Sequence, residues 1–151
     1  MSTAYTIQRF KTRFVKVPAP KLNSAPVITS PSCVLQFCQH FFRASPIEQF
    51  VFIALDNARS VIGFQVVEGA TNQCAIYPAN IFRFLLGTCA SAFIVAHNHP
   101  SGADYPSQPD WSVTRTLHTI GQLLSLPLLD HIIISGPSSY LSLKNDPQWP
   151  H

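Results

Sequence analysis

Charged residues are scarce in this chain, and carboxylates are scarcer still. Only 11% of its 151 residues are Asp, Glu, Lys or Arg, whereas 46% are hydrophobic. An intrinsically disordered chain shows the opposite balance, so the composition excludes that class of protein. A chain of this length forms one domain and buries a hydrophobic core without needing disulfides or structural metals.

Long apolar runs, a secretory leader and a disulfide-type cysteine pattern are also missing. No stretch reaches the roughly 18 apolar residues that cross a bilayer, and the first residues, MSTAYTIQRFKTRF, contain no apolar leader core. Four cysteines in a chain of this size do not form a disulfide framework. These absences predict a protein of the reducing cytoplasm without membrane association.

Acidic residues are absent from the first 47 positions, which carry six basic residues. Prolines cluster at positions 18, 20, 26 and 31, so we predict a basic arm and proline-rich linker over residues 1–30 and one domain over 31–151. Two interpretations of the arm are open. It is either a solvated leader or a segment that contacts nucleic acid through Arg9, Lys11, Arg13, Lys16 and Lys21.

Hydrophobic periodicity and helix breakers predict a mixture of strands and helices. Helices are expected over 31–42, 78–86 and 108–125, and strands over 48–56, 61–69, 90–97, 129–135 and 140–143. A further short strand is expected near 74–77, and residues 1–17 alternate as an edge strand does. The pattern indicates an α/β (α+β) domain with a mixed β-sheet and two hairpin turns, at 57–60 and 136–139.

Metal-binding side chains gather around the end of the strand over 90–97. His97 and His99 are two residues apart, and strand geometry points both imidazoles to the same side. Asp110 follows in the first turn of the next expected helix, three residues after Ser107. Two imidazoles and one carboxylate, with the fourth position left to water, are typical of a catalytic zinc site. Water bound there becomes a nucleophile near neutral pH.

Each part of this constellation has a simpler interpretation when it is taken alone. Two histidines near a strand end are often incidental. Ser107 and Asp110 are also a typical helix N-cap and third-residue acid, a pair that stabilises a helix without a metal. The combination, between a buried strand and a helix, favours the metal site.

The spacing H-x-H-P, then Ser107 and Asp110, resembles the JAMM motif of JAB/MPN zinc metalloproteases. The fuller text HNHPSG-x-x-x-PS-x-x-D is similar to the RadC-like branch, as are the flanking segments FVFIALDNARSVIGFQVVEGATN and LLSLPLLDHIIIS. The similarity runs from about residue 46 to 143 and implies a cytidine-deaminase-like sandwich of a mixed β-sheet flanked by helices. About 45 residues precede it, which is typical of short stand-alone RadC-like proteins.

The resemblance also implies roles for individual residues. His97, His99 and Asp110 would hold one Zn²⁺ per chain, and Ser107 would support the oxyanion of the tetrahedral intermediate. The family requires a glutamate base from an upstream strand, and the chain has only two glutamates, Glu48 and Glu68. We favour Glu48 and keep Glu68 as the alternative.

The function that the resemblance implies is zinc-dependent hydrolysis of peptide or isopeptide bonds in a peptide or protein substrate. Two other functions are retained, a nucleic-acid-associated accessory protein and a non-catalytic binding module. The chain has Ala79 and Asn80 where the family usually has an Arg-Glu pair. Among the other histidines, we expect His131 in the core or behind the metal site, with Asp130 as its partner, and His118 on the surface.

Overall fold

The computed structural model describes residues 26–42, 45–68 and 76–151. The basic arm, and with it the edge strand expected over residues 1–17, lies outside the described residues. The short strand expected near 74–77 is not found at Ile76 and Tyr77, and its first half is outside the described residues. The other expected helices and strands are all present.

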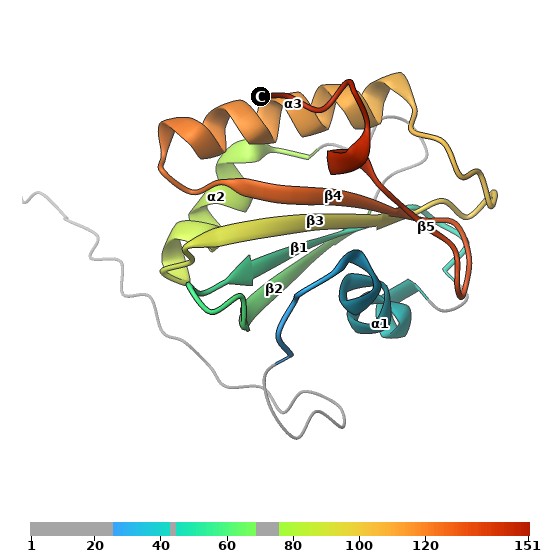
Figure 1. Ribbon diagram of the computed structural model, residues 1–151, viewed down its shortest axis with the longest axis horizontal. Helices are drawn as coiled ribbons and strands as arrows, with labels where there is room; N and C mark the ends of the chain where they lie inside the picture. The colour runs from blue at the N-terminus through green and yellow to red at the C-terminus, as the bar shows by residue number, and fades with distance from the viewer. Residues whose placement is uncertain (1–25, 43–44, 69–75) are drawn as a thin grey trace, which may run out of the picture.

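A mixed five-stranded sheet forms the centre of the domain, with strands in the order β2-β1-β3-β4-β5 (Figure 1). Only β3 and β4 are parallel, and the other neighbours are antiparallel. The strands are β1 (Gln49–Leu55), β2 (Val61–Glu68), β3 (Ala92–Asn98), β4 (Leu128–Ile134) and β5 (Tyr140–Ser142). The helices are α1 (Pro31–Phe42), α2 (Pro78–Gly87) and α3 (Gln108–Leu123), with a short 3₁₀ helix η1 (Leu143–Asn145).

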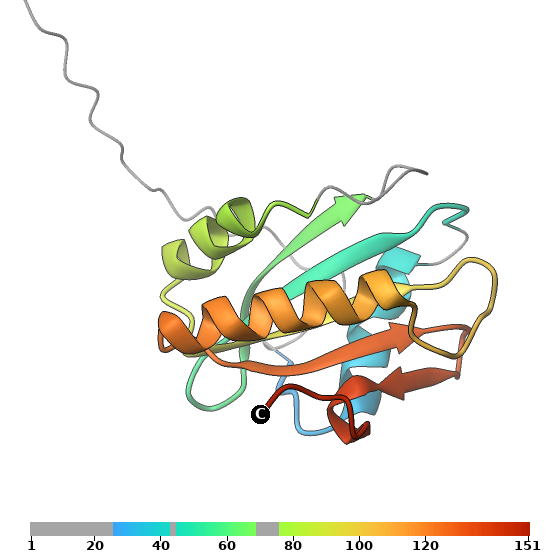
Figure 2. The same cartoon turned by 90° about the horizontal axis from the view of Figure 1, so that it is seen from above.

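Helices cover both faces of the sheet, which confirms the expected α+β sandwich. Helices α2 and α3 lie on one face and α1 on the other (Figure 1), and α3 runs lengthwise over the sheet (Figure 2). This arrangement explains the continuous apolar runs in β1 and β3, because a strand that is covered on both faces has no solvent-facing side. Within the described residues, no helix is both long and apolar enough to cross a membrane.

Two hydrophobic cores result, one on each face of the sheet. The core under α2 and α3 contains Phe50, Phe52, Phe82, Phe93 and Trp111. The core under α1 contains Val51, Ile53, Ile94, Ile132 and Cys38. Cys38 is fully buried, whereas Cys33 is only partly buried.

His118 corrects one expectation, because it is not on the surface. Its exposed fraction is 8%, and its ring forms a T-shaped pair with Trp149, with the two ring centroids 6.0 Å apart. Trp149 is itself buried near the end of the chain and packs on the core under α2 and α3. The helical repeat predicts which face of α3 carries His118. Only the tertiary structure shows that the C-terminal segment with Trp149 folds back and covers this face.

Gly121 provides a test of how closely α3 approaches the chain that follows it. A Cβ atom at this position would lie 2.5 Å from the carbonyl oxygen of Leu126, which is far inside contact distance. We expect Gly121→Ala to lower the free energy of unfolding by about 1–3 kcal/mol, the usual cost of overpacking a core. Urea denaturation followed by circular dichroism measures this change.

Gly87→Ala is the matched control, because no atom lies within 4 Å of the added methyl group at the end of α2. It should leave the free energy of unfolding unchanged or slightly raised. Equal stability of Gly121→Ala and the unmodified protein would contradict the close approach.

Candidate metal centre

Four side chains that can bind a metal converge beyond the carboxyl end of β3. They are Glu48, His97, His99 and Asp110, and one ligand atom from each lies within 4.8 Å of all the others. Glu48 precedes β1, and Asp110 belongs to the first turn of α3. His97 is near the end of β3, and His99 directly follows that strand. The register of β1 against β3, with Phe50 opposite His97, brings Glu48 to the histidines.

The distances between these ligand atoms are close to those of a tetrahedral zinc site, and the two imidazoles face different oxygens of Asp110. His97 Nε2 lies 2.9 Å from His99 Nε2 and 3.3 Å from Asp110 Oδ1. His99 Nε2 lies 3.5 Å from Asp110 Oδ2. Zinc bonds of about 2.0–2.1 Å in tetrahedral geometry place neighbouring ligand atoms roughly 3.3 Å apart. The residues present therefore match the chemistry and the size of such a site.

His99 is oriented by the turn that follows it. Its Nδ1–H donates a hydrogen bond to the carbonyl oxygen of Ala103, at 2.8 Å. Gly102 allows this turn because its φ of 77° lies in the left-handed region that favours glycine. The carbonyl can only accept, so Nδ1 carries a proton and Nε2 is directed to the cluster. The contact with Asp110 is the main cause that raises the pKa of His99.

Asp110 completes the capping box that Ser107 begins at the start of α3, and it faces the histidines at the same time. Its Oδ2 accepts hydrogen bonds from the Ser107 backbone N–H at 2.7 Å and from the Ser107 hydroxyl at 2.6 Å. The capping interpretation is therefore correct as well, and it leaves Oδ1 beside His97. Burial alone would raise the pKa of Asp110, but His99, His97 and the bonds from Ser107 outweigh it and hold the pKa well below its usual range.

His97 is completely buried under the site. Its ring is stacked on Phe50, with centroids 4.6 Å apart and planes 15° apart. Burial lowers the pKa of His97 well below its ordinary value, so its imidazole is neutral at neutral pH. Nδ1 lies 2.8 Å from Nε2 of His131, on the side away from the cluster. A neutral, immobilised imidazole is the form that binds a metal.

Glu48 is the glutamate that the fold brings to the cluster. Its Oε1 lies 3.6 Å from His97 Nε2, and 40% of its side chain is exposed. Burial, followed by the charge of Asp110, raises the pKa of Glu48. Glu68 instead faces Gln49 across the β1–β2 ladder and accepts its Nε2–H at 3.2 Å. It is not a member of the four-residue cluster.

Asn98 is a residue whose role the sequence analysis missed. Its Oδ1 accepts the backbone N–H of Gln49 at 2.7 Å, and its Nδ2 donates to the carbonyl of Ile47 at 3.2 Å. These two bonds hold the backbone on either side of Glu48. Asn98 alternates with the two histidines along the strand, so it points away from the cluster. Its position between them was the only signal in the sequence.

His131 lies behind the site, which is one of the two places expected for it. Asp130 accepts the His131 backbone N–H at 2.8 Å, but it is not the partner of the His131 ring. His131 Nδ1 lies 2.7 Å from the Thr114 hydroxyl on α3. Asp130 accepts hydrogen bonds from the Ser142 hydroxyl and the Lys144 backbone, and so holds the β5–η1 segment. Neighbouring strand residues face opposite sides of the sheet, and this separates Asp130 from the ring of His131.

Comparison with known proteins agrees with this geometry. A sequence profile of the RadC-like JAB domain matches residues 28–148. A UPF0758 protein of Geotalea uraniireducens is 38% identical over 125 residues, which are 82% of this chain and 54% of the relative. One of Trichlorobacter lovleyi is 35% identical over 143 residues, 94% of this chain and 62% of the relative.

A third relative, the UPF0758 protein BLi02933/BL00636 of Bacillus licheniformis, is 40% identical over 119 residues, which are 78% of this chain and 53% of that protein. The chain thus spans between about half and three fifths of the length of these relatives. The profile covers most of the chain, including every strand and helix described above and all four residues of the cluster. The chain therefore belongs to the RadC-like JAB domain family.

Proposed function

We propose that this domain is a zinc-dependent hydrolase of peptide or isopeptide bonds. The observation that carries the proposal is the convergence of two imidazoles and two carboxylates at one end of the sheet, with one ligand atom of each within 4.8 Å of the others. His97, His99 and Asp110 would hold one Zn²⁺ per chain. A set of two nitrogen ligands and one oxygen ligand suits zinc, whereas Mg²⁺ and Ca²⁺ prefer oxygen ligands throughout.

The chemistry divides between the metal and three side chains. When bound, zinc would polarise the scissile carbonyl and increase the acidity of water. Glu48 takes the proton of the attacking water and returns it to the leaving nitrogen. Its raised pKa is suited to both transfers. The Ser107 hydroxyl donates its one proton to Asp110 in this structure, and it turns that proton to the carbonyl oxygen as negative charge develops there.

Metal analysis and a cleavage screen test the proposal together. Purified protein should contain one zinc per chain by mass spectrometry of the metal. Zinc-loaded protein should cleave members of an internally quenched peptide library or an isopeptide-linked ubiquitin-like fusion, and a chelator should stop the cleavage. Protein with full zinc content but no cleavage of either substrate would favour the non-catalytic binding module. The nucleic-acid interpretation rests on the basic arm, outside the described residues, and stays a prediction.

Removal of the metal should leave the fold intact. The two cores are built from apolar contacts on both faces of the sheet, and the cluster lies beyond the carboxyl end of β3. Stability of the core therefore does not depend on zinc, in contrast to a small zinc finger. Zinc should still raise the melting temperature. At a free zinc concentration a hundredfold above Kd, binding stabilises the native state by about 2.7 kcal/mol. Loss of the circular dichroism spectrum on chelation would instead indicate a structural metal.

Zinc affinity should increase with pH through the raised pKa of His99 and then level off. Below that pKa a proton occupies the His99 Nε2 that faces the cluster, so zinc must displace it. Isothermal titration calorimetry in buffers of different ionisation enthalpy counts the protons released. An affinity that is independent of pH, with no proton release, would exclude His99 as a ligand.

A further inference from the structure

A buried chain of hydrogen bonds connects α3 to the candidate metal centre from behind. The Thr114 hydroxyl lies 2.6 Å from the carbonyl oxygen of Asp110 and 2.7 Å from His131 Nδ1. His131 Nε2 lies 2.8 Å from His97 Nδ1. Thr114, His131 and His97 each have an exposed fraction of 0%.

The first bond sets the direction of all the others. A carbonyl oxygen can only accept, and at 2.6 Å the Thr114 hydroxyl must place its single proton toward Asp110. The hydroxyl oxygen then accepts from His131, so the His131 proton is on Nδ1. Neutral His131 therefore accepts at Nε2, and the proton of His97 is on Nδ1. His97 Nε2 is left with a lone pair directed at His99 and Asp110.

We propose that Thr114 and His131 are positioning residues that hold His97 in the tautomer whose Nε2 can bind the metal. The inference rests on the metal site of the proposed function and goes beyond it. A neutral imidazole can carry its proton on either nitrogen, and a proton on Nε2 would block the ligand position. We call this chain of hydrogen bonds the relay. It begins at the backbone carbonyl of Asp110 and ends at His97, so it also connects two of the proposed ligands to each other.

Thr114→Val tests the relay, because valine keeps the shape of threonine and removes only the hydroxyl. Without its acceptor, the His131 proton is free to move to Nε2, and His97 loses its fixed tautomer. We expect ¹⁵N NMR of the metal-free protein to show the single proton of His97 on Nδ1 in the unmodified chain. In the variant, we expect a mixture of the two neutral tautomers, with the proton on Nδ1 in one and on Nε2 in the other. Zinc affinity, measured by competition with a chromophoric chelator, should fall about 10–100-fold.

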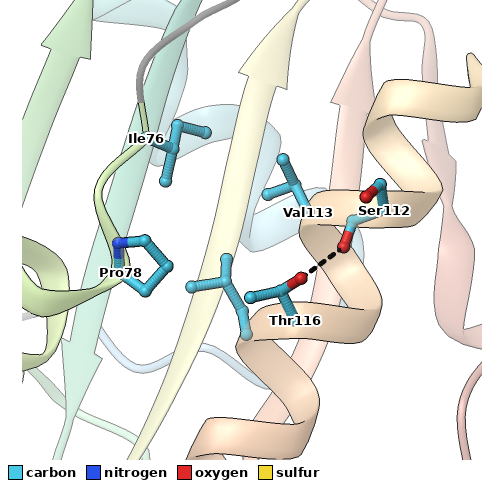
Figure 3. A pocket seen from close by; sticks show the side chains of 6 residues that line it. Ile76, Pro78, Ser112, Val113 and Thr116 are labelled. Atoms are coloured by element: carbon cyan, nitrogen blue, oxygen red, sulfur yellow. Dashed lines mark hydrogen bonds between the residues drawn. The ribbon is translucent and has the colours of Figure 1, made fainter.

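Two further variants separate the relay from a general effect on α3. Thr114→Ser retains the hydroxyl and should restore both the tautomer and the affinity. Thr116→Val removes a similar bond on the same helix, from the Thr116 hydroxyl to the Ser112 carbonyl at 2.9 Å (Figure 3). This bond is exposed and borders a cavity of about 90 Å³ between α2 and α3, so the tautomer and the affinity should not change.

The NMR measurement also separates this inference from the proposed function. A proton on Nε2 of His97 in the unmodified, metal-free protein overturns the relay, as does a Thr114→Val variant with unchanged tautomer and unchanged zinc affinity. A third outcome is a His97 proton on Nδ1 in the unmodified protein and on either nitrogen in Thr114→Val, while the protein binds no zinc. This outcome supports the relay and refutes the metal site. A Thr114→Val variant that fails to fold leaves the tautomer of the unmodified chain as the decisive result.

Discussion

Replacing Glu48 by glutamine should reduce peptide cleavage by about 10²–10⁴-fold, the usual contribution of general acid–base catalysis. Glutamine has the size of glutamate but cannot take up the proton of the attacking water. Zinc content and melting temperature should stay close to those of the unmodified protein, because His97, His99 and Asp110 are retained. Initial rates on the substrate found in the screen, together with metal analysis, measure both effects.

Glu68→Gln is the matched control for this experiment. Glu68 is close in space but lies outside the cluster, where it accepts a hydrogen bond from Gln49. Cleavage should therefore be unchanged. A fully active Glu48→Gln combined with an inactive Glu68→Gln would assign the base to β2. Full activity of both variants would show that a glutamate base is not used in this domain.

His97→Ala should abolish zinc binding and cleavage together. His97 is fully buried, and its Nε2 lies within 3.6 Å of an atom from each of the other three cluster residues. Its loss removes one of three proposed ligands and leaves a space that water cannot fill with the same geometry. Metal analysis should show the fall from one zinc per chain to nearly none. This result differs from that of Glu48→Gln, in which metal is kept and only the rate falls.

His40→Ala is the control, because this histidine is exposed on α1 and belongs to the opposite face of the sheet. Its zinc content should equal that of the unmodified protein. Asp110 requires a different substitution, since Asp110→Ala would also remove the side-chain oxygen that accepts the Ser107 backbone N–H in the capping box. Asp110→Asn keeps an oxygen for the cap and weakens the ligand. Unchanged zinc content in both His97→Ala and Asp110→Asn would show that the ligand assignment is wrong.

Local patterns in the sequence were sufficient to predict most elements and the centre of the candidate site. The starts of α2 and α3 follow from Pro78 and Ser107, whose effects on a helix N-terminus act over a few residues. His97 and His99 are on one side because strand side chains alternate. Asp110 is near them because one loop, over residues 99–107, joins the end of β3 directly to the start of α3. Each of these relations joins residues that are close in the chain.

The relations that complete the site join residues far apart in the chain, and only the tertiary structure decided them. The β1–β3 register selects Glu48 over Glu68, and Asn98 holds the backbone around Glu48 across a separation of about 50 residues. The packing of α3 on β4 pairs Thr114 with His131, where the sequence had suggested Asp130. Strand pairing and helix packing depend on the sum of many weak contacts over the whole core, so no single local pattern records them.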